Sequence, residues 1–157
     1  MREGRLDLIH MRPSYRHIGT HPFFKICFGM KIPGEETTNF ITMNKGADSL
    51  YSLIADEQFR TTSLGRDTWK ALFGSQGSLQ YNCNREGFNA KCDDVDGTRA
   101  RIGIIGNNEN HCSTCDSRIG FGTGGRYDDS NTCGIDAVAA PDNGDRRIKA
   151  MGYILIQ

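Results

Sequence analysis

The cysteines are the residues whose chemistry is easiest to assign in this sequence. The chain has six of them in 157 residues, and an even set in a small domain is typical of disulfides formed in an oxidising compartment. Cys112 and Cys115 form a C-x-x-C motif. Three disulfides explain the set best, and the spacing leaves their pairing open. A structural zinc site with Cys83, Cys92 and His111 ranks second. A thiol oxidoreductase ranks third, because the residues after Cys115 do not predict the helix that would activate a thiolate.

Acidic residues form the second chemically suggestive group. Residues 93–145 contain ten acids and four bases, and nine of the acids are Asp. Aspartate in loops rich in Gly and Asn is what calcium uses, because calcium prefers several oxygen ligands at flexible distances. The alternative is that Asp and Asn form turns through bonds to their own backbone, and for any single residue this is the simpler explanation.

Two glycine-containing motifs lack a feature that their functions require. Residues 120–125 match G-x-G-x-x-G, but turn-forming residues follow where a dinucleotide site needs a helix. These glycines predict a loop with positive φ angles. Residues 94–97 resemble part of a calcium-binding EF-hand loop, yet Gly103 stands where its bidentate Glu is needed. Asp96-Gly97 therefore predicts a hairpin turn.

No arrangement of residues supports catalysis. The four His residues have no catalytic spacing from a Ser or Cys nucleophile, and no pair of carboxylates stands out as an acid and a base. The sequence therefore predicts a protein that is not an enzyme.

Charge and hydropathy exclude two broad classes of function. Lys and Arg number 19 and Asp and Glu also number 19, so the net charge is zero. This balance argues against nucleic acid as a partner, and no apolar run approaches the roughly 18 to 20 residues of a membrane span. Residues 1–20 lack the apolar core of a signal peptide. With six Cys we still expect an extracellular protein, with its signal peptide absent from this chain.

The elements that must position these groups follow from hydrophobic periodicity. Residues 25–32 alternate as a half-buried strand that ends at the turn Pro33-Gly34, and residues 38–43 are rich in strand formers. Residues 48–56 predict a helix capped by Ser49 or Asp48. Residues 66–73 predict a second helix that buries Trp69 and stops at Gly74. Further strands are expected at residues 78–83, 99–105, 118–121 and 148–156, the last of them central because it is apolar on both faces, after a turn at Asn143-Gly144.

These elements predict an α+β fold in one domain. We expect one main β-sheet, two short helices early, long Gly/Asp-rich loops late, and stabilisation by disulfides. The domain should span residues 23–157, preceded by a loose basic tail over residues 1–22.

Several long blocks carry a resemblance to a known group of proteins. The blocks are KICFGMK, SLYSLIADEQFR, LQYNCNREGFNA, ARIGIIGNNEN, DSRIGFGTGG and DNGDRRIKAMGYILIQ. They resemble the C-terminal region of coral and sea-anemone extracellular proteins, which include skeletal organic matrix proteins. The resemblance covers most of the chain after Phe23 and implies an extracellular or matrix protein.

More distantly, the second half resembles intelectins, secreted fibrinogen-related lectins that bind glycan diols through calcium. The shared order is Asn-Asn-Glu after a strand, a Cys with an acid, a glycine run ending in Tyr, an acid, Cys-Gly, another acid and a closing strand. The resemblance implies a fibrinogen-related fold and assigns roles to particular residues. The calcium ligands would be Asn108, Glu109, Asp116, Asp129 and Asp136, and Tyr127 would contact carbohydrate.

The same resemblance implies a disulfide pairing and a function. The expected pairs are Cys83 with Cys115, Cys27 with Cys133, and Cys92 with Cys112. The expected function is that of a secreted, non-enzymatic matrix or recognition domain that binds calcium and carbohydrate, with extracellular glycans or matrix proteins as partners. A homo-oligomer is left open. The alternative is a disulfide-stapled structural module without a ligand site.

Overall fold

Two antiparallel β-sheets build the computed structural model, which describes residues 7–10 (backbone only), 22–126 and 128–157. The four-stranded sheet has the order β1 (Asp7–His10), β10 (Met151–Ile156), β2 (Phe23–Lys31) and β3 (Asn39–Ala47). The six-stranded sheet runs in chain order through β4 (Arg60–Thr61), β5 (Asn82–Lys91), β6 (Arg99–Asn107), β7 (Ser117–Gly124), β8 (Cys133–Ala137) and β9 (Arg146–Lys149). The expectation of one main sheet is thus wrong, while the mostly β architecture with two short helices is consistent with a small α+β domain.

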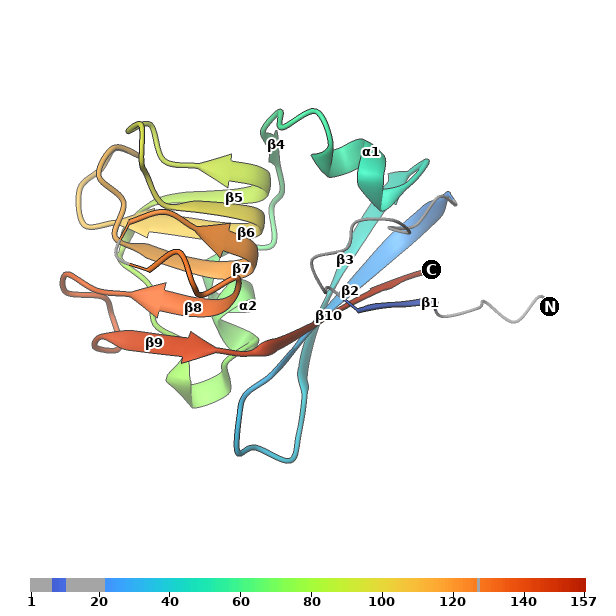
Figure 1. The fold of residues 1–157 in the computed structure, drawn as a ribbon, viewed down its shortest axis with the longest axis horizontal. Helices are drawn as coiled ribbons and strands as arrows, with labels where there is room; N and C mark the ends of the chain where they lie inside the picture. Colours follow the sequence, from blue (N-terminus) through green and yellow to red (C-terminus); the bar gives the residue numbers. More distant parts are fainter. Residues whose placement is uncertain (1–6, 11–21, 127) are drawn as a thin grey trace.

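The split into two sheets occurs within the predicted last strand. Residues 148–156 do not form one strand: β9 lies at the edge of the six-stranded sheet, and β10 lies between β1 and β2 in the other. Ala150 separates them, and Figure 1 shows the chain passing there from one sheet to the other. The prediction of a central strand is confirmed for β10.

The first strand and both helices form where the sequence predicts them. In β2, Ile26, Phe28 and Met30 are fully buried, as their alternation requires. Helix α1 (Leu50–Ile54) is capped by the Ser49 hydroxyl, which accepts a hydrogen bond from the Ser52 N–H at 3.0 Å. Helix α2 (Arg66–Ala71) ends two residues earlier than predicted, and a short 3-10 helix η1 (Gly74–Gln76) follows.

One hydrophobic core joins both sheets and both helices. The Phe28 ring of β2 lies 5.7 Å from the Trp69 ring of α2 and 5.5 Å from the Phe121 ring of β7, measured between centroids. Trp69 is fully buried and donates its indole N–H to Glu86 at 2.8 Å. The prediction that Trp69 belongs to the core is confirmed.

The glycine-rich stretch expected as a loop is mostly strand. Gly120 lies in β7, where it is part of a row of four glycines that pair directly across four neighbouring strands: Gly87, Gly103, Gly120 and Gly134. The φ angle of Gly120 is 154°, and a Cβ there would lie 2.2 Å from the Ile102 carbonyl oxygen. The row can therefore hold only glycine without moving the backbone.

The remaining segments differ from expectation in two places. The predicted strand over residues 78–83 is irregular up to residue 81, and β5 begins at Asn82. Four residues of the expected N-terminal tail, Asp7–His10, pair with β10 as the edge strand β1. In the part of the chain that the structure describes, no helix is long and apolar enough to cross a membrane.

Candidate functional site

Four of the six cysteines form two disulfides, and their pairing corrects the expected one. Cys83 pairs with Cys112, and Cys92 pairs with Cys115. The cause is the position of residues 107–116, which fold back over β5 and its end, so that Cys112 lies opposite Cys83, with 5.1 Å between their Cα atoms. Cys27 and Cys133 are free thiols, so their expected bridge is wrong as well.

The disulfide pairing also bears on the other two roles considered for the cysteines, a redox site and a zinc site. A dithiol redox site needs the two Cys of C-x-x-C to bond to each other, but Cys112 and Cys115 each bond to a cysteine from β5 or its end. Zinc needs thiolates, and the four sulfurs that gather here are consumed in disulfides. Cys92, Cys115, Ala100 and Ile105 form a small second core, which shows that the disulfides anchor the connection between β6 and β7.

The five residues expected to bind calcium come from three parts of the chain. Asn108 and Glu109 lie in the exposed connection after β6, and Asp116 directly precedes β7. Asp129 follows β7, and Asp136 lies within β8. Among the described residues, no group of three or more His, Cys, Asp or Glu is placed to hold a metal ion. Tyr127, expected to contact carbohydrate, lies outside the described residues.

Arginines pair with two of these carboxylates, Asp136 and Asp129. Asp136 is opposite Arg118 in the β7–β8 register, and the Arg118 Nη2 lies 3.2 Å from its Oδ2 in a pair that is 2% exposed on each side. The Arg147 Nε lies 3.4 Å from the other oxygen. Arg99 lies 3.3 Å from Asp129. Calcium needs about six to eight oxygen ligands, and these arginines compete with it for the oxygens of Asp136 and Asp129.

Burial governs the titration of this arginine–aspartate pair. It lowers the pKa of Arg118, although Asp136 acts in the opposite direction, and it raises the pKa of Asp136 against the effect of Arg118. Arg118 also donates to the carbonyls of Arg126 and Asp128. The pair therefore fastens the connection between β7 and β8 to the sheet, which is a structural role.

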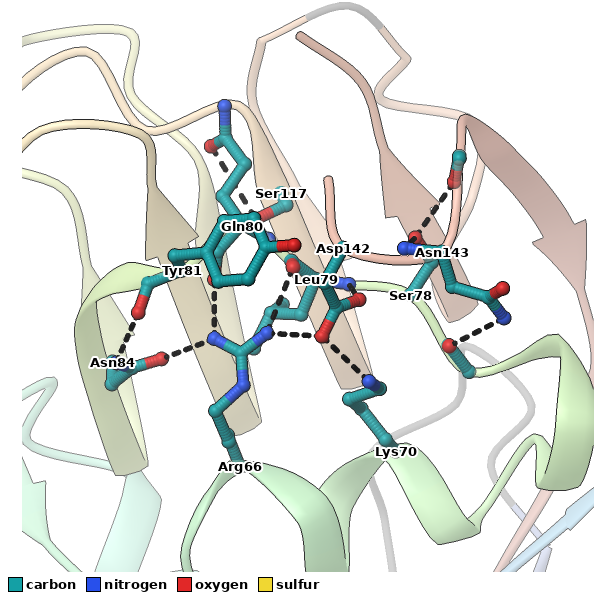
Figure 2. A network of polar contacts seen from close by, with 12 residues as sticks. Arg66, Lys70, Ser78, Leu79, Gln80, Tyr81, Asn84, Ser117, Asp142 and Asn143 are labelled. Carbon is teal, nitrogen blue, oxygen red and sulfur yellow. Dashed lines mark hydrogen bonds and ion pairs between the residues drawn. The ribbon is translucent and has the colours of Figure 1, made fainter. Parts of the chain in front are cut away.

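A second polar network fastens α2 to the irregular segment before β5 (Figure 2). The Arg66 guanidinium donates to the carbonyls of Gln80 at 2.6 Å and Leu79 at 2.9 Å. Asp142 accepts from Arg66 at 2.5 Å, from Lys70 at 2.6 Å and from the Leu79 N–H at 3.1 Å. Because both terminal nitrogens of Arg66 and both oxygens of Asp142 are used internally, this network is a structural clamp and has little capacity left for a ligand.

Charged groups with spare capacity gather instead at an open cleft of about 420 Å³. Three cations and one carboxylate line it: Lys91, Arg99, Arg101 and Glu57. Its other lining residues are Asn89 and the small residues Ala90, Ala100 and Gly122. We call this site the basic cleft. It lies where β5 ends and β6 begins, next to the segment that follows α1.

Strand pairing places the cations of the basic cleft. Lys91, the last residue of β5, is the direct cross-strand partner of Arg99, the first residue of β6. Arg101 donates to the Asn89 side chain at 3.0 Å and lies 3.5 Å from Glu57. Glu57 and Asn89 adopt φ angles of 59° and 54°, in the left-handed region that Asn tolerates better than most residues.

Sequence reasoning missed the basic cleft. The predicted turn at Asp96-Gly97 and the strand after it would have placed Lys91 near Arg99, but residues 82–91 were not identified as the partner strand. Comparison with known protein families, curated proteins and solved structures finds no match for this chain.

Proposed function

We propose that this chain is a secreted, non-enzymatic recognition domain that binds an extracellular glycan. The observation that carries the proposal is the basic cleft, in which Lys91, Arg99 and Arg101 present donors beside the Asn89 amide. A volume of several hundred Å³ is in the range of ligand sites, in which a few placed polar groups orient the ligand. A glycan is rich in hydroxyl and acidic oxygens that such donors bind.

The disulfides support secretion as the setting. Two bonds, Cys83–Cys112 and Cys92–Cys115, hold the connection before β7, and such bonds persist in oxidising compartments. The order of motifs from Asn108 to Asp136 further supports placing the chain with the fibrinogen-related, intelectin-like class, with matrix glycans or proteins as partners.

Screening the oxidised protein against immobilised glycans, with calcium and with a chelator, tests this function. We expect binding that does not require calcium, because Arg118 and Arg99 already pair with Asp136 and Asp129. Calcium at millimolar concentration should leave the melting midpoint unchanged, since only an ion that binds the folded state raises it. A calcium-dependent rise that is lost in Glu109→Ala would show that the ligand set implied by the resemblance does form.

The second candidate is a structural module without a ligand site. The clamp of Arg66 and Asp142 favours it, because the polar groups of this network bond to each other and stabilise the fold. The disulfides stabilise the fold as well. If the protein melts cooperatively but binds none of the immobilised glycans, this candidate is favoured over a recognition domain.

A further inference from the structure

We propose that the ligand of the basic cleft is an acidic polysaccharide, which binds through sulfate or carboxylate groups to Lys91, Arg99 and Arg101. This inference rests on the proposed function and names the class of glycan. It is carried by the charge and the strand register at the cleft.

Two like charges face each other at the cleft. Lys91 and Arg99 are direct cross-strand partners in an antiparallel pair, so their side chains leave the sheet on the same side, with Cβ atoms about 5 Å apart. Like charges at such positions destabilise a sheet. An anion bound between them would remove this repulsion, so the free protein is already arranged for a negative group.

The three cations are distributed along two neighbouring strands. Arg101 is two residues beyond Arg99 in β6, about 7 Å further along the strand. Three cations are therefore spread over two strands and do not converge on one point. A polymer with repeated anionic groups can contact all three at once.

The acids that pair with these cations are exposed. Glu57, 3.5 Å from Arg101, has a side chain that is 77% exposed, and Asp129, 3.3 Å from Arg99, is 71% exposed. Asp93 is also nearby, but it pairs with Arg85 at 2.7 Å. Exposed ion pairs contribute little net free energy, so a polyanion can displace Glu57 and Asp129. Within the described residues, no carboxylate pairs with Lys91.

A glycine leaves room at the site. Gly122 of β7 lines the cleft beside Arg101, whereas the side chains of Ala90 and Ala100 are buried on the other face of the sheet. A Cβ at Gly122 would lie 2.7 Å from the Arg101 Cβ. The space beside the Arg101 side chain is therefore kept open by the glycine.

The test measures binding of the oxidised full chain to heparin, to polygalacturonate and to neutral dextran, at several salt concentrations. We expect binding to both polyanions and none to dextran, with an affinity that falls as salt rises because counterions are released. Inorganic sulfate and phosphate should compete only weakly. Lys91→Gln and Arg99→Gln should each weaken heparin binding about fivefold, a change typical of one lost ionic contact.

Controls separate the site from overall charge and from folding. Lys31→Gln removes an exposed cation of the four-stranded sheet and should leave binding unchanged. Lys91→Gln should melt at or above the wild-type temperature, because it relieves the repulsion from Arg99.

The possible outcomes distinguish failure of the acidic ligand from failure of the glycan-binding function. Binding only to neutral glycans would overturn the acidic ligand and keep the recognition function, whereas binding to no glycan at all would overturn both. Heparin binding that both variants retain, or that Lys31→Gln weakens equally, would overturn the assignment to this cleft. Competition by inorganic phosphate as strong as that of heparin at equal charge would overturn the polymer as ligand.

Discussion

At the scale of single residues, Asp142 shows how one carboxylate can hold several elements. It accepts hydrogen bonds from Arg66 and Lys70 of α2 and from the backbone N–H of Leu79 (Figure 2). Burial raises the pKa of Asp142, but the bonds from Lys70, Leu79 and Arg66 lower it more, so its pKa lies below the ordinary value. The ionised form is therefore the one that stabilises the fold.

This linkage predicts how Asp142→Asn changes stability with pH. Because the folded pKa is depressed, the contribution of Asp142 is complete above the unfolded value, near 4, and is lost as pH falls through the lower folded pKa. We expect the variant to lose about 2 kcal/mol at pH 7 and to approach wild type in acid. Urea unfolding from pH 7 to pH 3 measures this. Asp145→Asn, at an exposed position, is the control, and an equal loss in both variants would contradict the clamp.

At the scale of elements, the glycine row sets how closely four strands can pair. A side chain at Gly120 would meet the Ile102 carbonyl at 2.2 Å with φ at 154°. We predict that Gly120→Ala lowers the free energy of unfolding by about 3 kcal/mol, from backbone strain and a backbone clash. The matched control is Gly46→Ala in β3, where a Cβ would lie 3.6 Å from the nearest atom, the Phe23 carbonyl oxygen, and should change stability little. Chemical denaturation compares them, and similar losses would refute the steric account.

At the scale of the whole molecule, one core joins the two sheets that Figure 1 shows, and two disulfides fix the connection between β6 and β7 within the six-stranded sheet. The disulfides span 29 and 23 residues of sequence, so each should contribute about 3 kcal/mol in the chain-entropy model. We therefore expect reduction to lower the urea midpoint of the whole domain. Cys27→Ser, which removes a thiol that the structure leaves free, should leave the disulfides intact and serves as the control.

Thiol counting and peptide mapping test the same disulfide pairing directly. The unfolded, unreduced chain should expose two thiols, Cys27 and Cys133, and mapping should recover Cys83 joined to Cys112 and Cys92 joined to Cys115. An unreduced chain without free thiols would instead restore a bridge between Cys27 and Cys133.

The sequence by itself determined the local features of this protein. The alternation at Ile26, Phe28 and Met30 predicted which face of β2 is buried, and the Ser49 cap and the burial of Trp69 followed from residue type and helical period. These features depend on neighbours within a few residues, which is the range over which period and propensity act.

Only the tertiary structure decided which distant residues meet. The turn at Ala150 into a second sheet, the swapped disulfide partners, and the pairing of Asp136 with Arg118 all depend on strand register across long connections. The same register puts Lys91 against Arg99. Periodicity reports which face of a strand is buried, but it does not report which strand lies beside it, because that choice is made by packing of the whole core.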